Sequence, residues 1–279
     1  MLQVDENVLK DIGRGFTVPA QPHLLLELQR LVGEDNPDLN RIAEAVSQDV
    51  SISATIIKTI NSPLYGLARS ISDIPKSVRY IGINGIVTLV TSKLIQSSFE
   101  QSKCSIELDD FWDNATNIAN TAVYIAKKLR KRVPSEKLFS LGLFHDCGIP
   151  VMAMKYKDYG DILQTANQTP SKTLINFEDE AYSVNHATIG YYVATSWRLP
   201  VDMCQLILRH HDIEYLNKLD GSSDQLCFAI LKMAEQIIYQ HKYFRDSSDW
   251  EYVRDSVFTV LDCDEELMQD IVEDIEEQL

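Results

Sequence analysis

Apolar residues recur at helical spacing along nearly the whole chain, and this periodicity constrains the fold more than any other feature. After Pro22, the apolar positions fall on one face of a helix: Leu24, Leu25, Leu28 and Leu31. Residues 51–60 are rich in β-branched side chains, which also suit a strand, but their isoleucines follow the helical period: Ile52, Ile56, Ile57 and Ile60. No convincing alternating strand or two-residue hairpin turn interrupts the pattern. The sequence therefore predicts an all-α fold.

Start and stop signals divide this pattern into separate helices. Gly33 ends the first, Asn36-Pro37 opens the second, and residues 61–66 interrupt the chain after the third. Asp109 or Asp110 is expected to cap a long helix that begins at Phe111. Other helices are expected over about residues 73–81 (with Gly82 as cap), 84–99, 135–145, 150–168, 172–183, 186–197, 201–211, 223–241, 249–260 and 264–278.

A polar segment, QSKCSIELDD at residues 101–110, is the candidate boundary between two parts of the chain. We therefore expect two packed helical lobes, residues 1–105 and residues 106–279. The second lobe ends in strongly acidic helices. We interpret their acidic residues as a solvated face rather than as an interaction tail, because apolar residues at helical spacing would dock the other face.

The charge balance excludes one class of function. Asp and Glu number 41 against 26 Lys and Arg, which gives a formal net charge of -15. Such a surface repels phosphate backbones and anionic lipids, so we expect no nonspecific binding of nucleic acid. The one basic run, KKLRKR at residues 127–132, is typical of the C-terminal end of a helix.

Cysteine usage and hydropathy point to a cytoplasmic location. The five cysteines are scattered and form no C-x-x-C pair, which fits a reducing compartment. The start, MLQVDENVLKDIGRG, lacks the apolar region of a secretion signal. No stretch of about 18 uninterrupted apolar residues occurs, so we expect no membrane span or membrane partner.

Residue types that bind metals recur at or near helix ends in the second half of the chain. They are His145, Asp146, His186, His210, His211 and Glu235. Divalent metals favour imidazole and carboxylate together, so these residues are candidate ligands. Adjacent His210 and His211 point about 100° apart on a regular helix. Both reach one pocket only if the helix ends there.

Structural interpretations of the same residues remain open. A histidine on an apolar helix is more often a hydrogen-bonded core or surface residue than a ligand. Glu235 lies between apolar turns and also suits a buried, paired carboxylate. Cys147 is interpreted as a small packed thiol rather than as a nucleophile.

The order of these residues resembles the HDOD branch of the HD superfamily of metal-dependent phosphohydrolases, an output domain of bacterial signalling proteins. The resemblance covers roughly residues 14–240. Its most distinctive segments are INSPLYG and SVRYIGINGI. In the second half of the chain, four further segments follow in the family's order: FWDNATNIAN, LGLFHDCGI, NHATIGYYVATSWRLP and ILRHH. It implies a helical bundle like that of HD domains, with a metal site that includes His145 and Asp146.

The chain departs from the superfamily pattern at three positions. Asn114 stands where the pattern has its first metal-binding histidine, and Glu235 stands where it has its final aspartate. Ile149 replaces a lysine found in the active cyclic-dinucleotide phosphodiesterases of the related HD-GYP branch. The resemblance therefore implies a divalent metal such as iron or manganese, bound weakly or not at all.

These departures favour a stand-alone regulatory HDOD module that is not catalytic. Such a module would act in signal transduction by binding a protein partner, a small molecule or a nucleotide. The alternative is a metal-dependent phosphohydrolase acting on a nucleotide or cyclic dinucleotide, in which Asp146 positions the ion and the attacking water. A helical scaffold without any ligand is the third interpretation.

Overall fold

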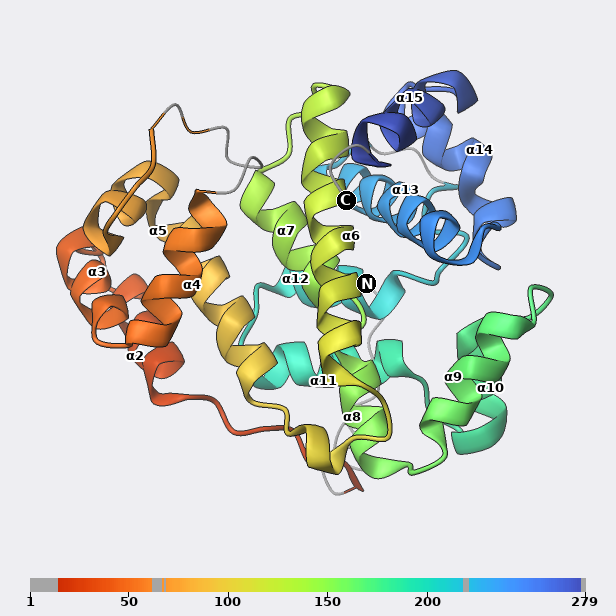
Figure 1. Ribbon diagram of the computed structural model, residues 1–279, viewed down its shortest axis with the longest axis horizontal. Helices are drawn as coiled ribbons and strands as arrows, with labels where there is room; N and C mark the ends of the chain where they lie inside the picture. The colour runs from red at the N-terminus through yellow and green to blue at the C-terminus, as the bar shows by residue number, and fades with distance from the viewer. Residues whose placement is uncertain (1–14, 62–66, 68, 218–220, 277–279) are drawn as a thin grey trace. The chain divides into compact units, whose positions relative to one another are not determined.

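The computed structural model describes residues 15–61, 67, 69–217 and 221–276 (Figure 1). Over these residues the chain is helical and contains no β-strand, as the periodicity predicts. The predicted break at residues 61–66 lies outside the described residues except for Asn61, as do the first 14 residues and the last three. The chain divides into two compact units, Pro19–Glu100 and Gln101–Leu279 with the residues before Pro19.

In the N-terminal unit, Pro19–Glu100, the described residues form four α-helices. They are α2 (His23–Val32), α3 (Leu39–Ser47), α4 (Val50–Ile60) and α5 (Ile74–Ser97). Three begin at an aspartate whose side chain accepts a hydrogen bond from a backbone N–H of the first turn: Asp38, Asp49 and Asp73. Their apolar faces meet in a core that includes the predicted positions Leu25, Leu28, Ile42, Ile52 and Ile56.

Helix α5 combines two helices that the sequence predicts separately. Gly82 lies inside it with φ 75° and ψ 178°, a conformation that only glycine adopts readily, so the predicted interruption is a kink. Among the described residues, α5 alone has the length and composition of a membrane span, with a mean hydropathy of 1.2. Half of that apolar window is buried within the protein, which is also typical of a core helix.

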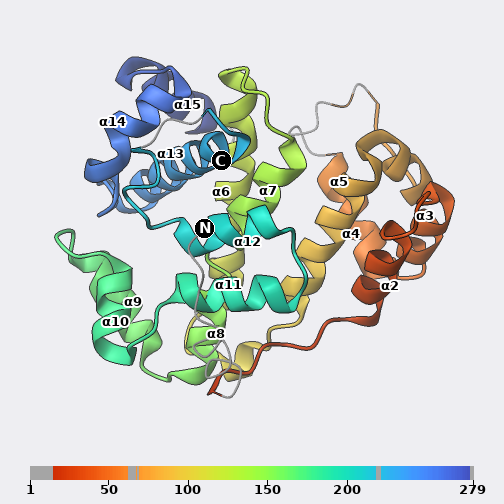
Figure 2. The ribbon, with the colours of Figure 1, turned by 180° about the vertical axis from the view of Figure 1, so that it is seen from behind.

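The C-terminal unit holds the other α-helices of the described residues, after a short 3-10 helix at Gln101–Lys103. They are α6 (Leu108–Lys128), α7 (Ser135–Phe144), α8 (Gly148–Lys155), α9 (Tyr159–Gln168), α10 (Leu174–Tyr182), α11 (His186–Ser196), α12 (Val201–Arg209), α13 (Ser223–Tyr243), α14 (Trp250–Leu261) and α15 (Glu265–Glu276). The long helix α6 packs along α7 and α13 (Figure 1). Seen from behind, α11 and α12 lie side by side (Figure 2).

The boundary between the units differs from the expected one at residue 105. Ser105 donates a hydrogen bond from its backbone N to Ala153 O at 3.1 Å and another from Oγ to Tyr156 O at 2.9 Å. Phe16 contacts the ring of Tyr156 edge-on, with 6.0 Å between centroids, and the Lys155 ammonium lies 3.8 Å from the Phe16 ring centroid. Residues 15–18 and 101–105 therefore belong with the C-terminal unit.

Two predicted helix boundaries are wrong. Helix α6 begins at Leu108 after Glu107, so Asp109 and Asp110 lie in its first turn, where their charges still favour the helix dipole, instead of capping it. The helix predicted over 150–168 is two helices, α8 and α9. Tyr156 between them is extended (φ -108°, ψ 117°), and its carbonyl accepts both from Ser105 Oγ and from the backbone N of Tyr159.

Close helix contacts at a glycine bring the polar residues together. A Cβ at Gly148 would lie 2.0 Å from His186 O and 2.6 Å from Gly190 N. The missing side chain therefore lets the start of α8 touch the start of α11. This contact places Asp146, just before α8, beside His186, the first residue of α11.

Candidate metal centre

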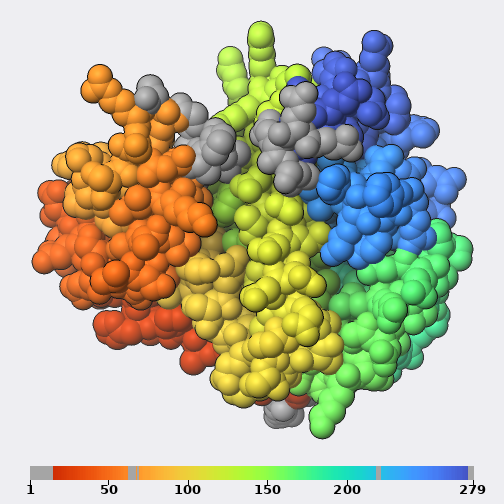
Figure 3. Space-filling model, viewed as in Figure 1, coloured from red at the N-terminus to blue at the C-terminus, as the bar shows by residue number. Residues whose placement is uncertain are grey.

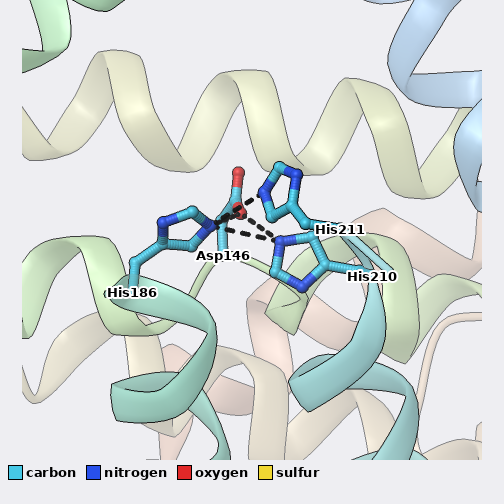
Figure 4. Close-up of side chains that lie close together, drawn as sticks. All are labelled: Asp146, His186, His210 and His211. Atoms are coloured by element: carbon cyan, nitrogen blue, oxygen red, sulfur yellow. Dashed lines mark hydrogen bonds and ion pairs between the residues drawn. The ribbon is translucent and has the colours of Figure 1, made fainter. Parts of the chain in front are cut away.

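Four of the predicted site residues converge on one point in the C-terminal unit (Figure 4). They are Asp146, His186, His210 and His211, and one ligand atom from each lies within 4.8 Å of all the others. Asp146 follows α7, His186 opens α11, and the adjacent pair stands at the end of α12. Three helix ends therefore contribute to one cluster.

The end of α12 allows both adjacent histidines to reach the cluster. The helix stops at Arg209, His210 is its C-cap, and His211 lies in the turn that follows. Their rings are tilted by 48° with 4.2 Å between centroids. The sequence-based condition that the helix must end at this pair is met.

The distances within the cluster match those between ligands of a single ion. His186 Nε2 lies 3.2 Å from His210 Nε2, 3.1 Å from His211 Nε2 and 3.3 Å from Asp146 Oδ1. His210 Nε2 lies 3.1 Å from the same Oδ1 atom. With metal–ligand bonds of about 2.1 Å, neighbouring ligand atoms are separated by about 3.0 to 3.4 Å. The four atoms could therefore share one ion with small adjustments.

Each histidine of the cluster is held through its other ring nitrogen. Nδ1 of His186 donates to Glu178 Oε2 at 2.7 Å, Nδ1 of His210 to Ile207 O at 2.6 Å, and Nδ1 of His211 to Asp249 Oδ2 at 2.5 Å. With Nδ1 protonated, the neutral form of each ring turns the lone pair of Nε2 toward the cluster. In that form three lone pairs and a carboxylate face each other, which is a donor arrangement that could bind a cation.

The pKa values of these groups show how strongly their charges interact. Burial lowers the pKa of His186, but the Glu178 and Asp146 carboxylates outweigh it and raise the pKa to about 10. Burial and the neighbouring rings of His211 and His186 lower the pKa of His210 to about 3. Although burial opposes it, the surrounding histidines hold the Asp146 pKa well below its usual range.

His145 and Glu235, also predicted as ligands, lie on the other side of the Asp146 carboxylate. His145 Nε2 is 3.2 Å from Asp146 Oδ2 and 3.2 Å from Glu235 Oε1, and its Nδ1 donates to Gly142 O at 2.8 Å. Burial lowers the pKa of His145, but the two carboxylates outweigh it and raise the pKa to about 10. These two residues therefore form a second, adjoining group rather than part of the four-residue cluster.

A buried lysine completes this second group, and sequence reasoning missed it. Lys232 Nζ lies 2.7 Å from Glu235 Oε2 and 3.4 Å from Asp249 Oδ2. Burial raises the pKa of Glu235, but Lys232 and His145 outweigh it and lower the pKa to about 2. Lys232 lies one turn before Glu235 on α13, and only this spacing could have indicated the pair from the sequence.

Glu178 and Tyr159 are two further residues that the sequence did not single out. Both are fully buried, and the Tyr159 hydroxyl donates to Glu178 Oε1. The other oxygen, Oε2, accepts from both the backbone N and Nδ1 of His186. A lone glutamate on the amphipathic helix α10 gives no signal of this role, because its partners lie on other elements.

The residues that depart from the superfamily pattern line a cavity beside the cluster. It has a volume of about 310 Å³, and its wall includes Asn114, Ile149, His145, Asp146 and Glu235. Residues of α6, α9 and α13 form its sides, and in Figure 3 these helices come together around a recess on this face. Cys147 is buried, and burial raises its thiol pKa, which supports the packing role predicted for it.

Comparison with known proteins yields one family and several similar folds. The model of the HDOD domain family matches residues 18–213. An uncharacterized protein of Treponema pallidum is 26% identical over 205 residues, which is 71% of this chain but 38% of that protein. The chain thus spans about two fifths of the length of this relative.

Two solved structures show the same fold. A proposed phosphohydrolase of Shewanella amazonensis SB2B has a TM-score of 0.68 at 20% identity, and the match covers 97% of this chain and 93% of that one. A proposed signal transduction protein of Marinobacter aquaeolei VT8 has a TM-score of 0.71 at 17% identity, covering 100% of this chain and 59% of that one.

Proposed function

The chain belongs to the HDOD domain family, and from this premise we propose that it is a regulatory module that binds one divalent metal ion without hydrolysing phosphoesters. Asp146, His186, His210 and His211 would hold the ion. The observation that carries the proposal is the convergence of three Nε2 atoms and one carboxylate oxygen, with every Nδ1 anchored elsewhere. Anchoring of this kind orients imidazole ligands at metal sites.

The donor set suits a transition metal. Three imidazoles and one carboxylate favour ions such as Fe²⁺, Mn²⁺ or Zn²⁺ over Mg²⁺ or Ca²⁺, which prefer oxygen ligands. A bound ion would act as a Lewis acid toward an oxygen or nitrogen of a small molecule. The cavity of about 310 Å³ beside the cluster offers space for such a ligand, with Asp146, His186 and His211 in its wall.

The same cavity argues against phosphoester hydrolysis. Hydrolases of this kind stabilise the charge that develops on phosphate oxygens with cations. At two positions where the superfamily pattern has a metal-binding histidine or a lysine, Asn114 offers a neutral amide and Ile149 offers no polar group, although the exposed Lys242 also lines the cavity. The buried Lys232 is engaged by Glu235 and Asp249 rather than directed at a free oxygen site.

Metal content measured together with hydrolysis tests this proposal. Protein purified without chelators and saturated with Mn²⁺ should hold one ion per chain and release no product from bis(p-nitrophenyl) phosphate or a cyclic dinucleotide. Asp146→Asn should lose the ion, and His241→Ala, at an exposed histidine of α13, should retain it. Hydrolysis by the wild type that disappears in Asp146→Asn would establish the phosphohydrolase alternative instead.

The output of the module is the second part of the proposal. The similar Marinobacter fold is described as a proposed signal transduction protein, which supports a signalling role here. We expect an occupied centre to change the affinity for a protein partner, because ligand binding shifts the population of the state it favours. If hydrogen exchange of helices α9 to α14 were identical with and without Mn²⁺, this signalling role would be refuted.

A further inference from the structure

Lys232 is a buried ammonium beside the candidate metal centre. Its side chain is 6% exposed and lies within ion-pair distance of two carboxylates, Glu235 and Asp249. A buried cation is stable only when such partners compensate for the loss of water. The lysine therefore supplies a fixed positive charge inside the C-terminal unit.

This charge lies next to a group of side chains that would otherwise suit a second metal ion. His145 Nε2 is 3.2 Å from an oxygen of Asp146 and 3.2 Å from an oxygen of Glu235. The buried atoms His145 Nε2 and Glu235 Oε2 have no aligned hydrogen-bond partner; Lys232 approaches the latter as an ion pair only. One imidazole and two carboxylates around a common point are the donors that a divalent cation takes.

The Asp146 carboxylate links this group to the proposed metal site. Its Oδ1 atom faces His186 and His210, and its Oδ2 atom faces His145. Ions held on the two oxygens of one carboxylate would lie about 3.5 to 4 Å apart, as in two-metal sites. A second ion would therefore have to bind close to the ammonium that already neutralises Glu235.

We propose that the ammonium of Lys232 takes the place of a second divalent ion and limits this centre to one metal. The inference rests on the proposed metal-binding function. Lys232 satisfies Glu235 and repels any cation that approaches His145, Asp146 and Glu235. Asp249 links Lys232 to the proposed metal site, because the Asp249 Oδ2 atom that pairs with the ammonium also accepts a hydrogen bond from Nδ1 of the proposed ligand His211.

Replacement of the ammonium tests the inference directly. Lys232→Met keeps the unbranched stem and removes the charge, and Lys242→Met is the matched control, because Lys242 is an exposed lysine that lines the same cavity. Mn²⁺ stoichiometry is measured by equilibrium dialysis and the bound ions by electron paramagnetic resonance. We expect one isolated ion in the wild type and in Lys242→Met. Lys232→Met should bind two ions whose spectrum shows spin coupling.

A double variant guards against loss of folding. Lys232→Met/Glu235→Gln removes a charge of each sign from the core, so it should fold and return the stoichiometry to one. Two ions in the wild type, or one ion in folded Lys232→Met, overturns the role of Lys232 but leaves the proposed function intact. No ion in any variant contradicts the proposed function as well. If Lys232→Met does not fold, the wild type at millimolar Mn²⁺ decides: one ion supports the inference, and a coupled pair overturns it.

Discussion

Glu178 holds His186 by two hydrogen bonds to one oxygen, from the backbone N at 3.1 Å and from Nδ1 at 2.7 Å. Both residues are fully buried, and the Tyr159 hydroxyl fixes the second oxygen of the carboxylate. The ring of His186 is thereby oriented with Nε2 toward Asp146. Glu178 is a positioning residue of the candidate centre.

Glu178→Gln should weaken metal binding about 10- to 100-fold, the usual effect of changing a partner of a metal-binding histidine. The amide keeps the size of the side chain but accepts less strongly from Nδ1. Calorimetric titration with Mn²⁺ measures the change. Glu180→Gln on the same helix is the control, because its side chain is 71% exposed and pairs with Lys172 at the surface. Equal affinities in the two variants would refute the positioning role.

Gly148→Ala should destabilise the protein and reduce metal affinity together. The new Cβ would meet His186 O at 2.0 Å, so α8 and α11 would have to separate. Overpacking of a core typically costs about 1 to 3 kcal/mol, and contact with rigid backbone places this variant at about 3 kcal/mol or more. Chemical denaturation and Mn²⁺ titration of the folded fraction measure both effects. A variant as stable as the wild type would show that these helices do not pack so closely.

The prediction of pH dependence concerns an ion triad away from the metal centre. Lys137 Nζ on α7 lies 2.5 Å from Asp202 on α12 and 2.7 Å from Asp224 on α13. Burial lowers the pKa of Lys137, but the two carboxylates outweigh it and raise the pKa above its ordinary 10.5. Burial raises the pKa of Asp202, but Lys137 outweighs it and lowers the pKa below 3.8.

Lys137→Met should therefore destabilise the protein by about 0.5 to 1 kcal/mol over roughly pH 5 to 9, a modest value because the carboxylates are partly exposed. Because the pKa of Asp202 is lower in the folded protein, its ionised carboxylate contributes fully to the free energy of unfolding above pH 3.8, and this contribution fades at lower pH. Because the pKa of Lys137 is higher in the folded protein, its protonated ammonium contributes fully to the free energy of unfolding below pH 10.5, and this contribution fades above that pH. Urea denaturation at several pH values measures this window. If the loss of stability in Lys137→Met relative to the wild type grew below pH 4, the triad would not stabilise the protein as an ion pair.

The sequence predicted the helices well because their signals are local. Apolar spacing, and start signals such as Pro22 and Pro134–Ser135, depend only on residues within one or two turns. The larger error, the single helix predicted over 150–168, occurred where a distant residue contacts the chain. At the break between α8 and α9, the Tyr156 carbonyl accepts a hydrogen bond from Ser105, which is about 50 positions away in the chain.

The candidate site was only partly predictable for the same reason. His186, His210 and Asp146 are conspicuous as metal-binding types, and the adjacency of His210 and His211 made a helix end at this pair the condition for a shared pocket. Glu178 and Lys232, by contrast, are single charged residues on amphipathic helices. The contacts of Glu178 with His186 and of Lys232 with Asp249 join different elements, which no local pattern indicates; only the spacing of Lys232 and Glu235 is a local signal.

The location of a bound ion tests the central claim most directly. Crystals soaked in Mn²⁺ and measured near the manganese absorption edge should give one anomalous peak within about 2.0 to 2.3 Å of Asp146 Oδ1 and of Nε2 of His186, His210 and His211. No second peak should appear between His145 and Glu235. If the cluster holds only water at saturating Mn²⁺, or if the ion binds elsewhere, the account of this centre is wrong.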